Sequence, residues 1–127
     1  MAEKWYFKSL ADGLQRKLQA GITTHIFHGE NLMLSVAEIA PHTLSIIHSH
    51  PEEQWGYLLE GECSRIQGEE EIPMQPGDFW HTPANTPHGV RTGERGAKII
   101  DIFSPPRQAY KEPGEGLAAT VYSSIPA

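Results

Sequence analysis

The sequence lacks three features that would each point to a particular class of protein. It has a single cysteine, Cys63, so it can form neither an intrachain disulfide nor a cysteine-rich metal site. No stretch approaches the roughly 20 apolar residues of a membrane-spanning helix. The charged first residues are not followed by the apolar segment of a secretory signal. We therefore expect a cytoplasmic protein in which Cys63 is a buried thiol.

Basic residues are few and scattered. The chain has 10 Lys and Arg against 16 Asp and Glu, which gives a formal net charge of −6. Proteins that bind nucleic acids or anionic membranes need clusters of basic side chains to neutralise phosphates. The sequence has no such cluster, so we expect neither a nucleic acid nor a membrane as partner.

Helical patterns are almost missing as well. The 12 glycines and 10 prolines are spread over 127 residues and separate short apolar runs, a pattern typical of strands joined by turns. The expected strands are 22–27, 31–39, 43–48, 54–59, 62–67, 70–74, 78–82, 88–91, 97–103 and 119–123. Only residues 10–18 could form a short helix, and Gly13 weakens that pattern. These runs predict a single all-β domain over residues 1–127, either a sandwich or a barrel.

Three of the seven histidines form a pattern suited to metal binding. His48 and His50 are two residues apart, so on a strand both imidazoles leave the same face. Gln54 follows, and His88 comes after the proline-rich segment 83–87. Neutral imidazoles are common ligands of divalent transition metals, and ligands from neighbouring strands can converge inside a barrel.

The two segments resemble the two sequence motifs of the cupin superfamily. In the first motif, two histidines separated by one residue precede an acidic ligand, which is followed after six more residues by a glycine; residues 43–61 carry this pattern. In the second, Pro-Gly-Asp leads to a proline-containing turn and a histidine, as in residues 76–88. The resemblance implies a cupin barrel, a double-stranded β-helix or jelly roll. It also implies one divalent metal ion, bound by His48, His50, Gln54 and His88.

Gln54 departs from the motif, because an amide stands where the family usually has an acidic ligand. A neutral amide leaves the site doubly positive, which suits an anionic ligand and Lewis-acid chemistry. It suits oxidative chemistry less well, where a carboxylate usually helps to hold iron or manganese. Three imidazoles and an amide accept nickel, zinc, iron, cobalt or manganese, so the sequence leaves the metal open.

A second cluster follows the motifs. Asp101 and Phe103 share one face of the run 97–103, while Ile100 and Ile102 share the other. An acid among apolar neighbours is costly to bury without a partner or a function. Two prolines then present Arg107, whose guanidinium suits a carboxylate. One interpretation is an Asp101–Arg107 salt bridge that closes the mouth of the barrel.

The other interpretation comes from a narrower resemblance. Three histidines and a glutamine, followed by Asp-Ile-Phe-Ser-Pro-Pro-Arg at 101–107, are similar to the pectin-degradation cupins of the KdgF type. The resemblance implies conversion of 4,5-unsaturated monouronates from pectin or alginate into the linear 4-deoxy-5-keto-uronate. Asp101 would then move protons, Phe103 would pack against the sugar and Arg107 would bind the substrate carboxylate. A homodimer is a further implication.

Two other functions stay open. A metal-dependent cupin dioxygenase acting on a small organic substrate would consume oxygen with iron, copper or manganese bound. A non-catalytic module would bind a small acid without changing it. The remaining histidines are expected on the surface or behind the ligands, and the sequence leaves the direction of His81 open; they are His25, His28, His42 and His81.

Overall fold

In the computed structural model, residues 4–123 are described, and they form nine strands and two short 3-10 helices. The elements are η1 (Leu10–Asp12), β1 (Leu14–Gln19), β2 (Ile22–His28), β3 (Met33–Ile39), β4 (Ile47–Ser49), β5 (Glu53–Gln67), β6 (Glu70–Met74), β7 (Phe79–Thr82), β8 (His88–Ser104), η2 (Gln108–Lys111) and β9 (Thr120–Tyr122). Residues 1–3 and 124–127, which the sequence assigns to the same domain, lie outside the described residues. Within the described part of the chain, no helix has the length and apolar character needed to span a membrane.

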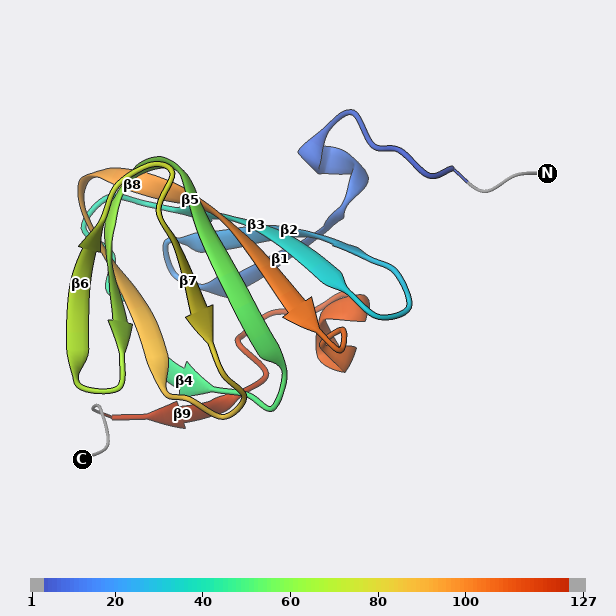
Figure 1. Cartoon of the computed structure of the whole chain (residues 1–127). Coiled ribbons are helices and arrows are strands. Elements are labelled where there is room, and N and C mark those ends of the chain that lie inside the picture. Colours follow the sequence, from blue (N-terminus) through green and yellow to red (C-terminus); the bar gives the residue numbers. More distant parts are fainter. Residues whose placement is uncertain (1–3, 124–127) are drawn as a thin grey trace.

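Two long strands, β5 and β8, organise the fold. They pair in antiparallel fashion along most of their length. The second half of β8 also pairs with β3, which continues into β2 and β1, while its first half meets β4 and, through it, β9. Strands β6 and β7 pair with β5. The strands curl around a shared interior as an antiparallel half-barrel, as Figure 1 shows.

A change of register in β5 decides which of its side chains face the interior. In the first half, Gln54 and Leu58 are buried and the residues between them are mostly exposed, as expected for a strand with one buried face. The pairing with β8 then shifts on either side of Glu60–Gly61. Gly61 has φ +85°, and a Cβ on it would lie 2.1 Å from the carbonyl oxygen of Gly96. Only glycine therefore fits this crossing of the two strands.

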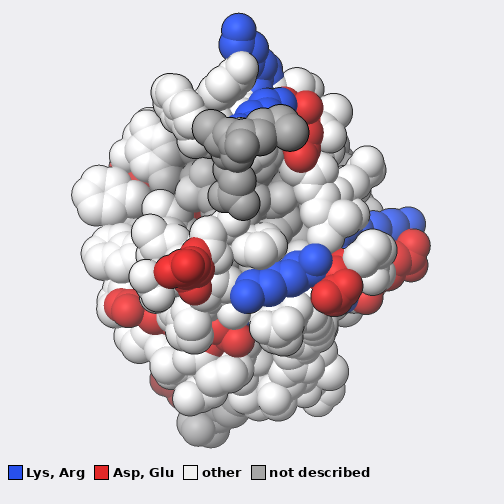
Figure 2. Space-filling view, turned by 90° about the vertical axis from the view of Figure 1, so that its right-hand side faces the viewer, with Lys and Arg blue, Asp and Glu red and all other residues white. Residues whose placement is uncertain are grey.

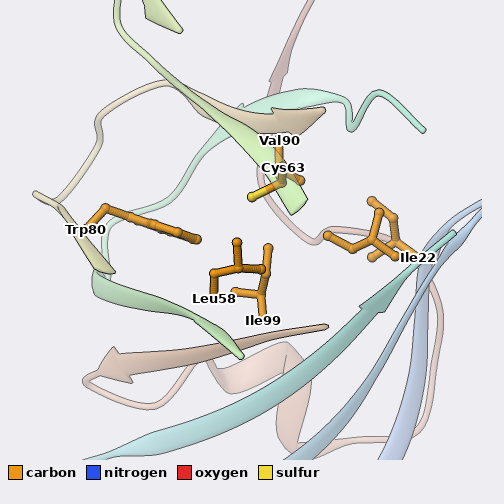
Figure 3. Close-up of a cluster of buried hydrophobic side chains, with 7 residues drawn as sticks. Ile22, Leu58, Cys63, Trp80, Val90 and Ile99 are labelled. Atoms are coloured by element: carbon orange, nitrogen blue, oxygen red, sulfur yellow. The ribbon is translucent and has the colours of Figure 1, made fainter. Parts of the chain in front are cut away.

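Apolar side chains fill the interior in two clusters. The larger is drawn in Figure 3 and consists of Ile22, Ile39, Leu58, Cys63, Trp80, Val90 and Ile99. The smaller consists of Ile26, Met33, Phe103 and Tyr110. Burial raises the pKa of Cys63 to about 11, so this residue is a protonated thiol, buried as predicted. The same interior holds buried polar side chains, and these form the site described below.

Charged side chains on the outer surface are mixed in sign on the face drawn in Figure 2. Lysine and arginine do not gather there into a continuous patch, and acidic side chains lie beside them. Three arginines are buried inside the fold; they are Arg16, Arg65 and Arg107.

Most expected strands are confirmed, with three differences. Of the expected strand 43–48, only residues 47 and 48 lie in a strand, β4, because residues 43–46 pair with their neighbours only through an isolated bridge at Leu44 and single hydrogen bonds. The runs 54–59 and 62–67 join into β5, and the runs 88–91 and 97–103 join into β8. The expected helix at 10–18 is wrong beyond Asp12, because residues 14–19 pair with β2 as a strand. Buried Arg16 anchors this strand by donating hydrogen bonds to the carbonyls of Ala109, Glu115 and Gly116, contacts that its local sequence does not reveal.

Candidate metal centre

Three of the predicted ligands meet in the interior. His48 lies on β4 directly opposite His88 on β8, and His50 follows the end of β4. One ring nitrogen from each histidine can be chosen so that all three lie within 4.8 Å of one another. The ring centroids of His48 and His88 are 4.3 Å apart, and those of His50 and His88 are 5.0 Å apart. The spacing of the histidines in the sequence therefore becomes a compact triad.

Backbone carbonyls fix the tautomer of each imidazole. The Nδ1 atoms lie 2.8, 3.0 and 2.7 Å from the carbonyl oxygens of Ile46, Glu52 and Thr86, for His48, His50 and His88 respectively. A carbonyl only accepts, so in the neutral ring Nδ1 carries the hydrogen and Nε2 keeps its lone pair. Among the described residues, the buried Nε2 of His88 has no hydrogen-bond partner. Such an unpaired acceptor fits a metal ion.

Gln54 completes the set of donors. Its Nε2 donates to Oδ1 of Asp101 at 2.9 Å, which leaves its Oε1 facing Nε2 of His50 at 3.0 Å. Both facing atoms are acceptors when the hydrogen of His50 is on Nδ1, and a cation between them would turn their repulsion into coordination. Three imidazole nitrogens and an amide oxygen suit a divalent transition metal.

The histidines are held in the form that binds metals. Burial, reinforced by the charge of Arg107, lowers the pKa of His48 and His50 from 6.5 to about 4. Burial lowers the pKa of His88 in the same direction. All three imidazoles are therefore neutral at neutral pH, and their lone pairs are available.

Metal affinity should change little between about pH 7.5 and pH 5.5. Protons compete with the metal for the imidazoles only when the pH approaches the pKa of the metal-free site, here about 4 for His48 and His50. Three histidines with an ordinary pKa near 6.5 would instead lose roughly a thousandfold in affinity over this range. Competition titrations of zinc against a chromophoric chelator would measure the change. A loss of a hundredfold or more at pH 5.5 would contradict this account of the site.

The second predicted cluster lines the same cavity. Asp101, Phe103 and Arg107 surround a volume of about 60 Å³ together with His48, Gln54 and His88. Burial raises the pKa of Asp101, while the charges of the neighbouring arginines and the hydrogen bond from Gln54 oppose the rise. The structure therefore places an acid with altered proton affinity beside the histidines.

Arg107 is held by its own chain. Its Nε lies 3.6 Å from Oε1 of Glu52, and its Nη2 donates to the carbonyls of Leu117 and Ala118 at 2.7 and 3.0 Å. Its guanidinium carbon also lies 4.0 Å from the centre of the Tyr110 ring. The Asp101–Arg107 salt bridge considered above does not form among residues 4–123, because Glu52 takes that place.

The other histidines lie away from the triad. His81 is on the outer surface, where its Nε2 lies 2.6 Å from Oε2 of Glu53, so its direction is now settled. The Nε2 of His25 lies 3.2 Å from Oε1 of Glu38 on β3. His28 and His42 are exposed, and His42 lies in a turn with φ 55°.

Sequence reasoning missed Arg65, which is buried and lines the cavity. Counting alternate residues from Gln54 places Arg65 on the outer face of the strand. The register change around Gly61 reverses that alternation and turns Arg65 inward. A glycine in the middle of a long strand is the signal that could have revealed it.

Comparisons with known proteins identify the family and the fold. A family model described as "Cupin domain" matches residues 35–103. The pectin degradation protein KdgF of Dickeya dadantii (strain 3937) is 31% identical over 103 residues, which cover 80% of this chain and 86% of that protein. Two further curated relatives are matched over 14% and 20% of their own lengths.

Two solved structures share the fold. The structure of KdgF from Halomonas sp. superposes with a TM-score of 0.71 at 27% identity, covering 78% of this chain and 94% of that one. An RmlC-like cupin from Shewanella frigidimarina gives a TM-score of 0.75 at 22% identity, covering 87% and 99%. The likeness at 22% identity supports the fold alone.

Proposed function

The chain belongs to the cupin domain family, and from this premise we propose that it is a metal-dependent enzyme converting 4,5-unsaturated monouronates into linear 4-deoxy-5-keto-uronate. The observation that carries the proposal is the hydrogen bond from Gln54 to the partly buried Asp101, which ties an acid to the candidate metal ligands. The similarity to a protein named for pectin degradation supports the choice of substrate.

The proposed reaction is an isomerisation and needs only the movement of protons. The anomeric hydroxyl at C1 loses its proton, the bond between C1 and the ring oxygen breaks, and C1 becomes an aldehyde. The released electron pair passes to the ring oxygen and forms an enolate across C4 and C5. Protonation of C4 then leaves a ketone at C5. One proton is removed and one is added, so neither an oxidant nor water is consumed.

The residues of the cavity suit these steps. Asp101 would accept and return the proton, and its raised pKa favours this exchange. Phe103 is almost fully buried and would form an apolar wall against the sugar carbons. Arg107 would attract the substrate carboxylate. A divalent ion, when bound by the histidines and Gln54, would supply Lewis acidity to the substrate oxygens.

The cavity is small for a sugar acid. A cavity of about 60 Å³ has room for an ion and one or two groups of the size of water, less than a sugar acid needs. The carbonyl of Leu117, which also lines the cavity, accepts hydrogen bonds from Arg107 and Tyr110. The carbonyl of Leu117 therefore holds two side chains of the cavity wall in place.

An NMR time course with a 4,5-unsaturated monogalacturonate tests the proposal. We expect the vinyl proton at C4 to disappear faster with the metal-loaded protein than without it. Prior treatment with a chelator should return the rate to that of the spontaneous reaction, and added metal should restore it. A rate that never exceeds the spontaneous one would reject the uronate reaction. Oxygen consumption by the same samples would instead favour a dioxygenase.

A further inference from the structure

Arg65 is a buried cation that forms no direct ion pair among the described residues. Only 7% of the surface of Arg65 is exposed, and the residue lines the cavity that contains the histidines. Among residues 4–123, no carboxylate lies within ion-pair distance of Arg65, and its Nε has no hydrogen-bond partner. Its guanidinium packs over Trp80 at 5.4 Å, and its Nη2 donates to Oγ1 of Thr82 at 2.8 Å.

Strand register brings Arg65 beside the candidate metal ligands. Thr82, which accepts its hydrogen bond, lies directly opposite Gln54 in the pairing of β5 with β7. The hydroxyl of Thr82 in turn donates to Oε1 of Gln67 at 2.7 Å, and Gln67 lies directly opposite His88. The partner of Arg65 is therefore opposite Gln54 and is linked to the residue opposite His88 by a hydrogen bond.

The two arginines of the cavity differ in the partners of their charge and of their N–H groups. Arg107 is paired with Glu52 and donates to two backbone carbonyls. Arg65 has one hydroxyl as acceptor and stays charged at neutral pH, because burial lowers its pKa only to about 10. A buried charge is costly unless an opposite charge is paired with it, and Asp101, the acid on the same cavity, raises the pKa of Arg65 by its charge but forms no ion pair with it. A bound anion would offset this cost.

We propose that Arg65 forms a second anion-binding position, which holds a negatively charged oxygen of the ligand in addition to the carboxylate attracted by Arg107. The site would then take small acids that carry two anionic groups. The identity of the second group rests on the proposed function: it is the ring oxygen, which becomes negative as its bond to C1 breaks. Arg65 would lower the barrier by stabilising that charge.

Binding of simple acids tests the position without the uronate. Malonate carries two carboxylates and acetate one, and calorimetry at constant ionic strength would measure both with the zinc-loaded protein. We expect Arg65→Gln to weaken malonate binding about tenfold and to change acetate binding less than about twofold. Malonate can chelate zinc equally in both proteins, so the difference reports Arg65. Arg91→Gln is the matched control, because Arg91 is exposed and pairs with Glu71 on the surface.

A second measurement uses the unaltered protein and does not depend on the variant folding. The Nε–H signal of Arg65 in ¹⁵N NMR should shift on addition of malonate and stay in place with sodium chloride at the same ionic strength. An unmoved signal, or equal malonate affinity in Arg65→Gln and the parent, would show that Arg65 only packs against Trp80 and Thr82. If malonate binds as expected but the uronate is not turned over, only the proposed reaction fails.

Discussion

Replacing His88 with alanine is expected to abolish metal binding and, with it, turnover of the unsaturated uronate. The change removes the imidazole whose Nε2 is buried without a partner, and leaves two histidines and an amide. Because loss of a group that merely supports a ligand costs about 10- to 100-fold in metal affinity, loss of the ligand itself should cost at least about 100-fold. Metal content after dialysis and the NMR assay would measure both effects.

The matched control is His81→Ala. His81 is also a histidine on a strand, but it is exposed and pairs with Glu53 outside the barrel. This variant should keep its metal and its activity. Circular dichroism should show both variants folded, since neither apolar cluster includes His88 or His81. Metal bound with undiminished affinity by the folded His88→Ala variant would refute the proposed ligand set.

Asp101→Asn should keep the metal and lose turnover. Asparagine has the same shape and its Oδ1 can still accept the hydrogen bond from Gln54, so the amide ligand keeps its orientation. It cannot accept and return a proton, so we expect kcat to fall by about 10²- to 10⁴-fold. Steady-state kinetics on the unsaturated uronate and metal analysis of the same preparation would separate the two properties.

Glu38→Gln serves as the control for this change. Glu38 lies on β3 and pairs with His25 away from the triad, so its loss of charge should leave kcat unaltered. If Asp101→Asn turned over substrate at the rate of the parent, Asp101 could not be the group that moves protons. If the Asp101→Asn variant lost its metal together with its activity, the main role of Asp101 would be its contact with Gln54.

The convergence of the three candidate histidines could be predicted from the sequence because much of their geometry is local. Two histidines on one strand face and a third after a proline-rich turn need only a barrel to meet. The partners of Arg107 could not be predicted in the same way. Its acceptors at Leu117 and Ala118 are in a segment without strand or helix periodicity, and Glu52 reaches it across the fold.

Arg65 shows a second limit of local patterns. Side-chain direction along β5 follows simple alternation only as far as the register change near Gly61, and one shifted residue reverses every side chain beyond it. The homodimer and the cytoplasmic location, in contrast, involve surroundings beyond a single chain. They stay predictions from the sequence.

The hydrogen bonds from the three imidazoles to backbone carbonyls have a consequence for how such a site can diversify. Each ring is oriented by the main chain two residues away, at Ile46, Glu52 and Thr86, whatever side chains those positions carry. The three imidazole rings should therefore keep their orientation when other residues that line the cavity are replaced. One arrangement of candidate ligands could therefore be combined with different cavity walls, such as one with a buried arginine on β5, and so with different substrates.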